Sequence, residues 1–226
     1  MITKQDTSDF VLMDLRNRII LREYEPEQFI TEGELADYYN ISRGPVREVL
    51  KALSNEGILT TCPNGRRKIN KITYDFVNNL FNTRKLLEVQ AVKEIINSEF
   101  VKVSKLITYL ESFQEINKEN NNDVIYKKRF EINENFHKEL FNMAENIPLQ
   151  RCWVTIEPII NAFTKLNAED LDLKNHHNDY IKTHQKILEY LMNKDPEILN
   201  YMVYHIDSAK KDALKNMRNR IKDFDE

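Results

Sequence analysis

The chain has 226 residues, which is long enough for one or two domains with a packed core. Charged residues make up 31% and hydrophobic residues 41%, with four glycines and six prolines, a balance typical of a soluble protein rich in helices. There is no signal-peptide pattern and no apolar run long enough to span a membrane. Cys62 and Cys152 lie far apart without a CxxC pair, which disfavours a disulfide framework or a thiolate zinc site. Together these features predict a cytoplasmic protein with no membrane partner.

The net charge of −3 is unevenly distributed along the chain. Residues 1–41 hold four Lys or Arg and nine Asp or Glu, and residues 72–226 hold 22 and 25. Residues 42–71 hold seven Lys or Arg against two Glu, a local excess of +5. Because phosphate affinity depends on where the cations lie, this segment predicts a nucleic-acid contact surface in an otherwise acidic chain.

The N-terminal part begins with a helix, expected from Phe10 to about Leu21, which packs behind the motif that follows. Residues 31–57 (TEGELADYYNISRGPVREVLKALSNEG) then predict two short helices joined by a tight turn. Thr31 and Glu34 have the spacing of a capping box, in which each side chain binds a free backbone N–H at the start of the first helix. Asn40 suits the turn because Asn tolerates the left-handed backbone conformation.

The second helix of this motif separates its residues by chemistry. Ser42 is a suitable N-cap, and Pro45 falls in the first turn, where its missing N–H costs little. A buried stripe is expected at Val46, Val49, Leu50 and Leu53. Arg43, Arg47 and Lys51 stand at i, i+4 and i+8 and form a cationic row on another face. This pattern predicts the recognition helix of a DNA-binding protein, and the alternative is an ordinary amphipathic helix with a solvated charged face.

A β-hairpin is expected after the second helix. Residues 58–62 and 68–72 have the composition of two strands, and Asn64-Gly65 between them favours a turn with positive φ. The cations at its tip are Arg66 and Arg67. Such a wing could enter a minor groove or contact phosphates, and the alternative is a solvated basic loop.

Beyond Thr73–Asp75 the chain predicts helix after helix. The expected helices are Asp75 to Asn97, Val101 to about Asn117, Val124 to about Ala144, about Leu149 to Leu166, about Asp179 to Met192 and Pro196 to Lys222. A polar loop is expected at residues 118–122, and an acidic irregular segment at residues 167–178. The sequence therefore predicts a mainly α fold, in which a winged helix-turn-helix with a small β-hairpin (residues 1–73) precedes an all-α helical bundle (residues 74–226).

Three histidines lie in three separate predicted helices: His137, His184 and His205. Asn133 stands four residues before His137 and therefore on the same helix face. Side chains from three helices can converge in a bundle core, and three imidazoles bind zinc or nickel while leaving a position open to a ligand. From spacing alone, a hydrogen-bonded core histidine is the alternative for each. The adjacent pair His176 and His177 falls in the segment expected to be irregular and is interpreted as solvated.

The segment SRGPVREVLKALSNEGIL, followed by PNGRRKIN, resembles the winged helix-turn-helix of the GntR family of bacterial transcriptional regulators. The matching residues are Ser42, Arg43, Pro45, Val46, Arg47, Glu48, Leu50, Leu53, Glu56 and Gly57. Two departures lie upstream, where Glu25-Pro26-Glu27 replaces a usual Pro-Gly and where Gly33 replaces a DNA-contacting arginine of some relatives. The residues expected at the DNA interface are Thr31, Ser42, Arg43, Gly44, Pro45, Arg47, Lys51, Asn64, Gly65, Arg66 and Arg67. A symmetric homodimer on a palindromic operator is expected, because one short motif makes too few contacts for tight selection.

The region after residue 75 resembles the FCD ligand-binding domain of the FadR subfamily of these regulators. The residues that carry the resemblance are Arg84, Glu88, Phe136, His137, Ala144, Asn146, His184, Ile187, Asp195 and His205. The resemblance implies a divalent metal held by three histidines and by an aspartate four residues before the first, and His137, His184 and His205 match the histidines. Asn133 stands in place of the aspartate and is a weaker, neutral ligand. Arg84 either anchors an anionic effector or pairs with a nearby acid.

The leading interpretation is a ligand-responsive, dimeric DNA-binding repressor of a bacterial metabolic operon, with no catalytic residues. Its helical domain would bind a small carboxylate effector, with a zinc or nickel ion in the site, and would carry the dimer contacts. A second interpretation is a metalloregulator, in which the metal itself is the signal. A third is a zinc hydrolase with three histidines and an open water position, although no carboxylate is clearly placed as its general base.

Overall fold

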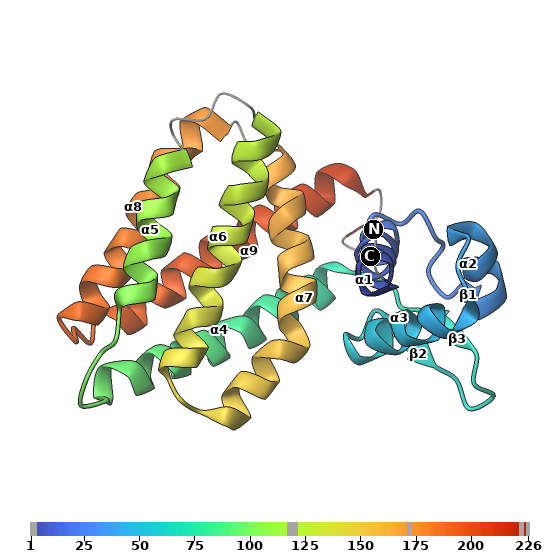
Figure 1. Ribbon diagram of the computed structural model, residues 1–226, viewed down its shortest axis with the longest axis horizontal. Coiled ribbons are helices and arrows are strands. Elements are labelled where there is room, and N and C mark those ends of the chain that lie inside the picture. The colour runs from blue at the N-terminus through green and yellow to red at the C-terminus, as the bar shows by residue number, and fades with distance from the viewer. Residues whose placement is uncertain (1–3, 117–121, 171–172, 222–223, 225–226) are drawn as a thin grey trace. The chain divides into compact units, whose positions relative to one another are not determined.

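A computed structural model of the protein describes residues 4–116, 122–170, 173–221 and 224. Contacts divide the chain into two compact units, which we call the N-terminal unit (Met1–Val77 with Met217–Glu226) and the helical unit (Asn78–Asn216) (Figure 1). The sequence predicts a division after residue 73, and the grouping by contacts adds the C-terminal end of the chain to the first unit. Among the described residues, no helix combines the length and the apolar character that a membrane crossing requires.

The N-terminal unit combines three helices with a small antiparallel sheet. Its elements are α1 (Lys4–Ile20), β1 (Phe29–Ile30), α2 (Glu32–Tyr39), α3 (Arg43–Asn55), β2 (Leu59–Thr61) and β3 (Arg67–Ile69). Both α1 and α2 pack against α3. Helix α1 begins earlier than the sequence predicts, and its apolar residues Leu15, Ile19 and Ile20 are buried.

The start of α2 is fixed by the predicted capping box, which the structure confirms. The Glu34 N–H donates to Thr31 Oγ1 at 3.2 Å, and the Thr31 N–H donates to Glu34 Oε2 at 3.1 Å. Asn40 has the expected left-handed conformation, with φ of 51°. Ser42 has the extended backbone of an N-cap, but its side chain makes no capping hydrogen bond, so the predicted cap of α3 is wrong in that detail.

Helix α3 is oriented by its apolar stripe, because Val46, Val49, Leu50 and Leu53 are all buried as predicted. The strands then form a sheet in the order β1-β3-β2, with Phe29 and Thr60 both opposite Lys68. The hairpin turn is closed by the Gly65 N–H, which donates to the Cys62 carbonyl at 2.9 Å, and Gly65 has φ of 80°. Strand β1 lies where the sequence predicts no strand, because two residues are too short for an alternating pattern.

The helical unit consists of a bundle. Its helices are α4 (Tyr74–Asn97), α5 (Ser104–Ile116), α6 (Asn122–Met143), α7 (Ile147–Asp170), α8 (Leu173–Met192) and α9 (Ile198–Arg220). Helix α6 lies between α5 and α7, and α8 packs against α5 (Figure 1). Ala91 of α4, Phe141 of α6 and Leu149, Trp153 and Ile160 of α7 form a core cluster.

The acidic segment 167–178 is helical at its described residues, so the predicted irregular structure is wrong. Helix α7 continues to Asp170, and α8 begins at Leu173. The segment contains no Pro or Gly, and its polar side chains do not themselves end a helix. His176 and His177 therefore lie on α8, although the placement of their side chains is outside the described part. The loop expected at residues 118–122 also falls outside it, except that α6 begins at Asn122.

The C-terminal end of the chain packs within the N-terminal unit. Met217, Ile221 and Phe224 are buried, and the Tyr74 N–H donates to the Phe224 carbonyl at 3.2 Å. The Arg218 guanidinium lies 5.2 Å from the centre of the Tyr74 ring. Helices α4 and α9 therefore each have one end in the N-terminal unit and the rest in the helical unit.

Candidate DNA-binding surface and histidine cluster

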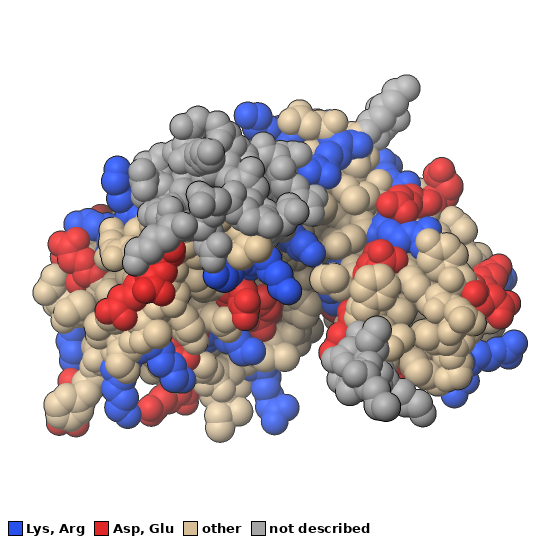
Figure 2. Space-filling view, turned by 45° about the horizontal axis from the view of Figure 1, so that its top comes forward, with Lys and Arg blue, Asp and Glu red and all other residues tan. Residues whose placement is uncertain are grey.

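The residues predicted to contact DNA lie at the surface of the N-terminal unit. Most are exposed, and the partly buried ones are Pro45 and Arg67. Arg43, Arg47 and Lys51 are all exposed along α3, on a different face from the buried stripe. Figure 2 shows basic and acidic side chains interspersed over the face of the molecule in view. The cationic excess of α3 and the wing is evident from the sequence of residues 42–71.

Arg47 is held by a carboxylate that sequence reasoning missed. Its Nε–H donates to Glu32 Oε1 and its Nη2–H to Glu32 Oε2, both at 2.9 Å, which makes a bidentate pair between α3 and the first residue of α2. The hydrogen bonds from Arg47 lower the pKa of Glu32, and the charges of Arg67 and Arg43 lower it further. Glu32 is therefore an anion among three arginines of the predicted interface. Only tertiary structure joins residues 15 positions apart in this way.

The other cations of this surface have different partners. A Cβ on Gly33 would lie 3.6 Å from Arg43 Nη2, so the Arg43 guanidinium lies beside this glycine. Arg66 stacks on the Phe29 ring, with 3.9 Å between the guanidinium carbon and the ring centre. Arg67 Nη1–H donates to Thr61 Oγ1 at 2.7 Å.

Two predicted interface residues have structural hydrogen bonds in the protein itself. Thr31 uses its hydroxyl in the capping box, where it also donates to Glu34 Oε2 at 2.8 Å. Asn64 Oδ1 accepts from the Arg66 N–H at 3.1 Å and so shapes the wing turn. Both side chains help to set the backbone that carries the arginines.

In the helical unit the three predicted histidines come together. One nitrogen from each of His137 (α6), His184 (α8) and His205 (α9) lies within 4.8 Å of the others. The Nε2 atoms of His137 and His205 are 3.3 Å apart. His137 and His184 are buried, with 3% and 0% exposure, and His205 is partly buried. We refer to these three residues as the histidine cluster.

A buried ion pair on α4 supports His137. Glu88 Oε2 lies 2.7 Å from His137 Nδ1, so that nitrogen carries the proton that it donates, and Nε2 faces the cluster. Arg84 Nε–H donates to Glu88 Oε1 at 2.5 Å, and Arg84 Nη2 lies 3.3 Å from His137 Nε2. Burial would raise the pKa of Glu88, but the charge of Arg84 and the hydrogen bonds from His137 and Arg84 outweigh it and lower that pKa to about 2. Arg84 thus pairs with a nearby acid and also reaches the cluster.

The donor set of the cluster fits a divalent metal ion. Burial lowers the pKa of His137 and, more strongly, that of His205, so both imidazoles are neutral at pH 7 and have a lone pair to offer. Asn133 is buried one turn before His137 on α6. Arg129 is also buried, one turn before Asn133 on the same face of this helix.

Within the described part of the chain, the carboxylate that contacts the cluster is not arranged as a general base for hydrolysis. Glu88 is the carboxylate in hydrogen-bond contact with His137, and both of its oxygens are used, one by His137 and one by Arg84. A general base needs an oxygen that can take a proton from water, and a pKa of about 2 makes Glu88 a weak base.

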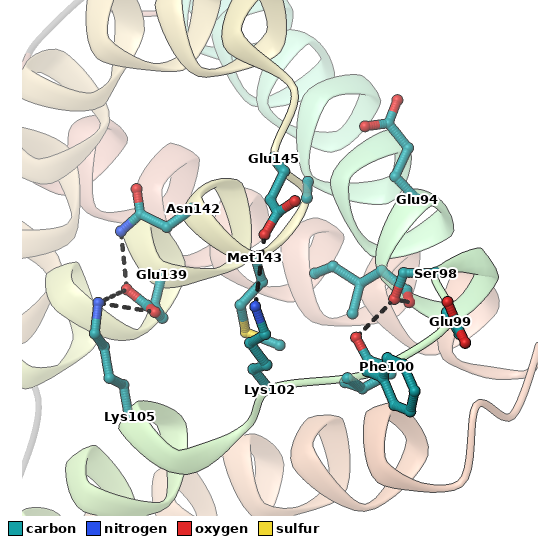
Figure 3. Close-up of a pocket in the computed structure, with 13 residues that line it drawn as sticks. Glu94, Ser98, Glu99, Phe100, Lys102, Lys105, Glu139, Asn142, Met143 and Glu145 are labelled. Atoms are coloured by element: carbon teal, nitrogen blue, oxygen red, sulfur yellow. Dashed lines mark hydrogen bonds and ion pairs between the residues drawn. The ribbon is translucent and has the colours of Figure 1, made fainter.

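A separate hollow of about 400 Å³ lies between the ends of α4 and α6 and the start of α5 (Figure 3). Two of the four carboxylates along it have cationic partners. Glu139 lies 3.2 Å from Lys105 Nζ, and Glu145 lies 4.0 Å from Lys102 Nζ. This hollow contains no residue of the histidine cluster, and its lining of four glutamates and two lysines mixes both signs of charge.

A winged helix-turn-helix joined to an all-helical unit with a buried histidine cluster defines a DNA-binding transcription regulator with a ligand-sensing domain. Residues 7–68 match the "Bacterial regulatory proteins, gntR family", and residues 79–208 match the FCD domain. The chain therefore belongs to the gntR family of transcription regulators, in the group that carries an FCD domain, and this group consists of regulators and not enzymes.

Relatives agree with this assignment, and a solved structure shows the same fold. The chain is 23% identical to the gluconate operon transcriptional repressor of Bacillus subtilis over 208 residues, 88% of this chain and 81% of that one. It is 24% identical to the HTH-type transcriptional repressor RspR of Escherichia coli, over 93% of this chain and 90% of that one. The solved structure of Lar, described as controlling the agr system of Listeria monocytogenes, has a TM-score of 0.68 at 17% identity. It covers 92% of this chain and 96% of its own and shows the same fold.

Proposed function

We propose that this regulator is a repressor that binds a palindromic operator as a homodimer and releases it when a small carboxylate binds the helical unit. Two relatives named as repressors support repression as the direction of control. The FCD domain supports placement in the FadR subfamily. The observation that carries the proposal is the convergence of His137, His184 and His205 beside Arg84.

His137, His184 and His205 would hold the metal, zinc or nickel, with the amide oxygen of Asn133 as a neutral fourth donor. When bound, such an ion supplies a double positive charge and an open coordination position, both of which favour a carboxylate ligand. Glu88 fixes the ring of His137 so that Nε2 faces the cluster. Arg84 lies beside His137 and would contact an anion bound there, while Glu88 compensates part of its charge.

The proposed response uses helix α4. It begins at Tyr74 in the N-terminal unit and carries Arg84 and Glu88 beside the cluster, so one continuous helix joins the sensing residues to the unit with the wing. A ligand can shift an equilibrium between two helix arrangements only by binding one of them better. A carboxylate that engages Arg84 and the metal together would supply that difference. Because half-site spacing is geometrically demanding, a small displacement would be enough to lose half of the contacts.

Dimerisation is tested by light scattering with and without an operator duplex. Binding of two half-sites about one helical turn apart requires two copies of α3 related by a two-fold axis. We expect a dimer at micromolar concentration and a footprint on both half-sites. A monomer that protects one isolated half-site would contradict the proposal.

The sensing role is tested by operator affinity, measured by fluorescence anisotropy for wild type and His184→Ala with and without carboxylate. Gluconate is the first probe, because one relative is named for the gluconate operon, and a panel of small mono- and dicarboxylates follows. We expect wild type to release the operator and His184→Ala to keep ligand-free binding but lose the response. Gln185→Ala, at an exposed position on the same helix, is the matched control and should respond as wild type does. A His184→Ala protein that still responds would refute the role of the cluster.

The metalloregulator alternative is separated in the same titration. Zinc or nickel added to metal-stripped protein without any carboxylate would release the operator if the metal were the signal. If the metal is a fixed part of the site, metal alone leaves operator affinity unchanged, and the carboxylate acts only on the metal-loaded protein.

A further inference from the structure

Among the described carboxylates of the predicted DNA surface, Glu32 is the one that makes a two-point contact with an arginine of the recognition helix. Glu32 begins α2, and it lies close enough to Arg47, Arg67 and Arg43 for all three charges to act on it. An anion there repels DNA phosphates, which weakens binding to any sequence. Its position among the arginines therefore calls for a role that offsets this repulsion.

The geometry of the pair shows which N–H groups of Arg47 are bound to Glu32 and which are available to another partner. A guanidinium has five N–H groups, and the Nε–H and one Nη2–H of Arg47 are bound to the two oxygens of Glu32. The opposite edge, formed by Nη1 and the other Nη2–H, is left for another partner. Guanine presents two acceptors, O6 and N7, in the major groove, and they match two parallel N–H groups of an arginine.

The pair also limits the motion of a long side chain. The Arg47 side chain is 63% exposed, so without a partner it could sample many rotamers and contact phosphates as well as bases. A two-point contact with Glu32, which is itself fixed at the start of a capped helix, holds one orientation before DNA arrives. The other arginines of the surface contrast with it. Arg66 stacks on an aromatic ring and Arg67 binds a hydroxyl, so these contacts leave their charges for phosphates.

We propose that Glu32 is a positioning residue for sequence reading: it orients the free edge of Arg47 toward a guanine and neutralises the charge that Arg47 would otherwise offer to phosphates. Glu32 thus lowers the affinity for DNA of any sequence and raises the discrimination at one base pair of each half-site. This inference rests on the proposed operator binding and names the residue that determines one position of its sequence.

The test is selection of binding sites from a random-sequence duplex library by full-length wild type, Glu32→Ala, Glu32→Gln and Arg47→Ala. Wild type should select a guanine at one position of each half-site, and Arg47→Ala should lose that preference. In Glu32→Ala the preference for guanine over the other bases at that position should fall by about tenfold, the order of one bidentate base contact. The preferences at other positions should stay unchanged. Glu32→Gln keeps one hydrogen-bond acceptor and should fall between the two.

A second readout separates positioning from a structural role. Binding of each variant to a single random-sequence duplex is followed as salt increases, and Glu32→Ala should bind this duplex more tightly at low salt. Its salt dependence should steepen by about one counterion per recognition helix, because Arg47 becomes available to phosphate. Glu23→Ala is the matched control, since it removes an exposed carboxylate that pairs with Arg18 at 2.8 Å in the same unit. It should leave base preference and salt dependence unchanged.

The outcomes separate this inference from the proposed function. If wild type selects no sequence, operator binding itself is refuted. If wild type selects a site and Glu32→Ala selects the same site with the same preferences, only the positioning role is refuted. The positioning role would also be overturned if Glu32→Ala lost a preference for cytosine that Arg47→Ala kept. In that case Glu32 would read a base directly.

Discussion

Each unit of this regulator contains arginine–glutamate pairs, and the pair on the predicted DNA surface differs in burial from the pair beside the histidine cluster. In the N-terminal unit, Arg47 and Glu32 are 63% and 33% exposed at the side chain, whereas in the helical unit Arg84 and Glu88 are 4% and 0% exposed. An exposed pair adds little to folding stability because water and salt screen it. A buried pair must remain intact, because removal of one partner leaves a charge without compensation. We therefore expect the exposed pair to act on recognition and the buried pair to fix the architecture around the histidine cluster.

The largest expected effect is that of Glu88→Ala. This change leaves Arg84 buried without its carboxylate and removes the acceptor of His137 Nδ1–H, so we expect a loss of about 3–5 kcal/mol in the free energy of unfolding. Urea unfolding followed by circular dichroism measures it. Glu88→Gln keeps the shape and one acceptor and should lose less. A loss below about 1 kcal/mol for Glu88→Ala would mean that the pair does not organise the site.

The next effect is on DNA binding. Arg47→Ala should weaken operator binding by roughly fivefold to a hundredfold, the range of one good base contact, with folding intact. Anisotropy titration at fixed salt gives the affinity, and a thermal melt confirms the fold. Arg47→Lys serves as the conservative comparison and should not restore full discrimination, because an ammonium cannot make the planar two-point contact. An unchanged affinity for Arg47→Ala would remove Arg47 from the interface.

A gain of affinity is expected from Gly33→Arg. A Cβ at this position meets Arg43 Nη2 at an ordinary contact distance of 3.6 Å, so a side chain can be added without displacing the backbone. The new cation should tighten binding to random-sequence DNA at low salt and steepen the salt dependence by about one counterion per motif. Gly33→Ala controls for the helix and should leave DNA binding unchanged. Equal salt slopes for Gly33→Arg and Gly33→Ala would show that this face does not approach phosphates.

The smallest expected effect is that of Glu32→Ala on stability. Its partner Arg47 is exposed, so loss of the pair should shift Tm by no more than about 3 °C. Differential scanning calorimetry compares it with Glu88→Ala, and the difference between the two variants measures the contrast between the exposed and the buried pair. A large destabilisation by Glu32→Ala would assign the exposed pair a folding role and weaken its proposed role in recognition.

Much of the fold follows from local sequence patterns. The capping box at Thr31 and Glu34, the buried stripe of α3 and the long helix α4 each depend on spacing along a single element, and the structure contains all three. The convergence of the histidines is expected mainly from the resemblance to FCD domains, because spacing alone fits separate core histidines equally well, although a bundle core can bring side chains of three helices together.

The remainder depends on contacts between distant segments. Arg47 pairs with Glu32 across 15 positions and His137 with Glu88 across 49, and no local pattern indicates which acid meets which base. The return of the chain end to Tyr74 and the two-residue strand β1 are also tertiary effects. The helical backbone at the described residues of 167–178 differs from the prediction for another reason: the acidic, polar composition favours a loop, but the segment contains no Pro or Gly that would break a helix.

The most direct test of the sensing site is a crystal structure of the protein as purified, with anomalous scattering recorded at the zinc and nickel absorption edges. We predict an anomalous peak within coordination distance of His137, His184 and His205, together with density for a carboxylate carried over from the cell. Three histidines in the same positions with hydrogen bonds to one another, and no anomalous peak after growth and purification without chelators, would contradict a metal-dependent sensor.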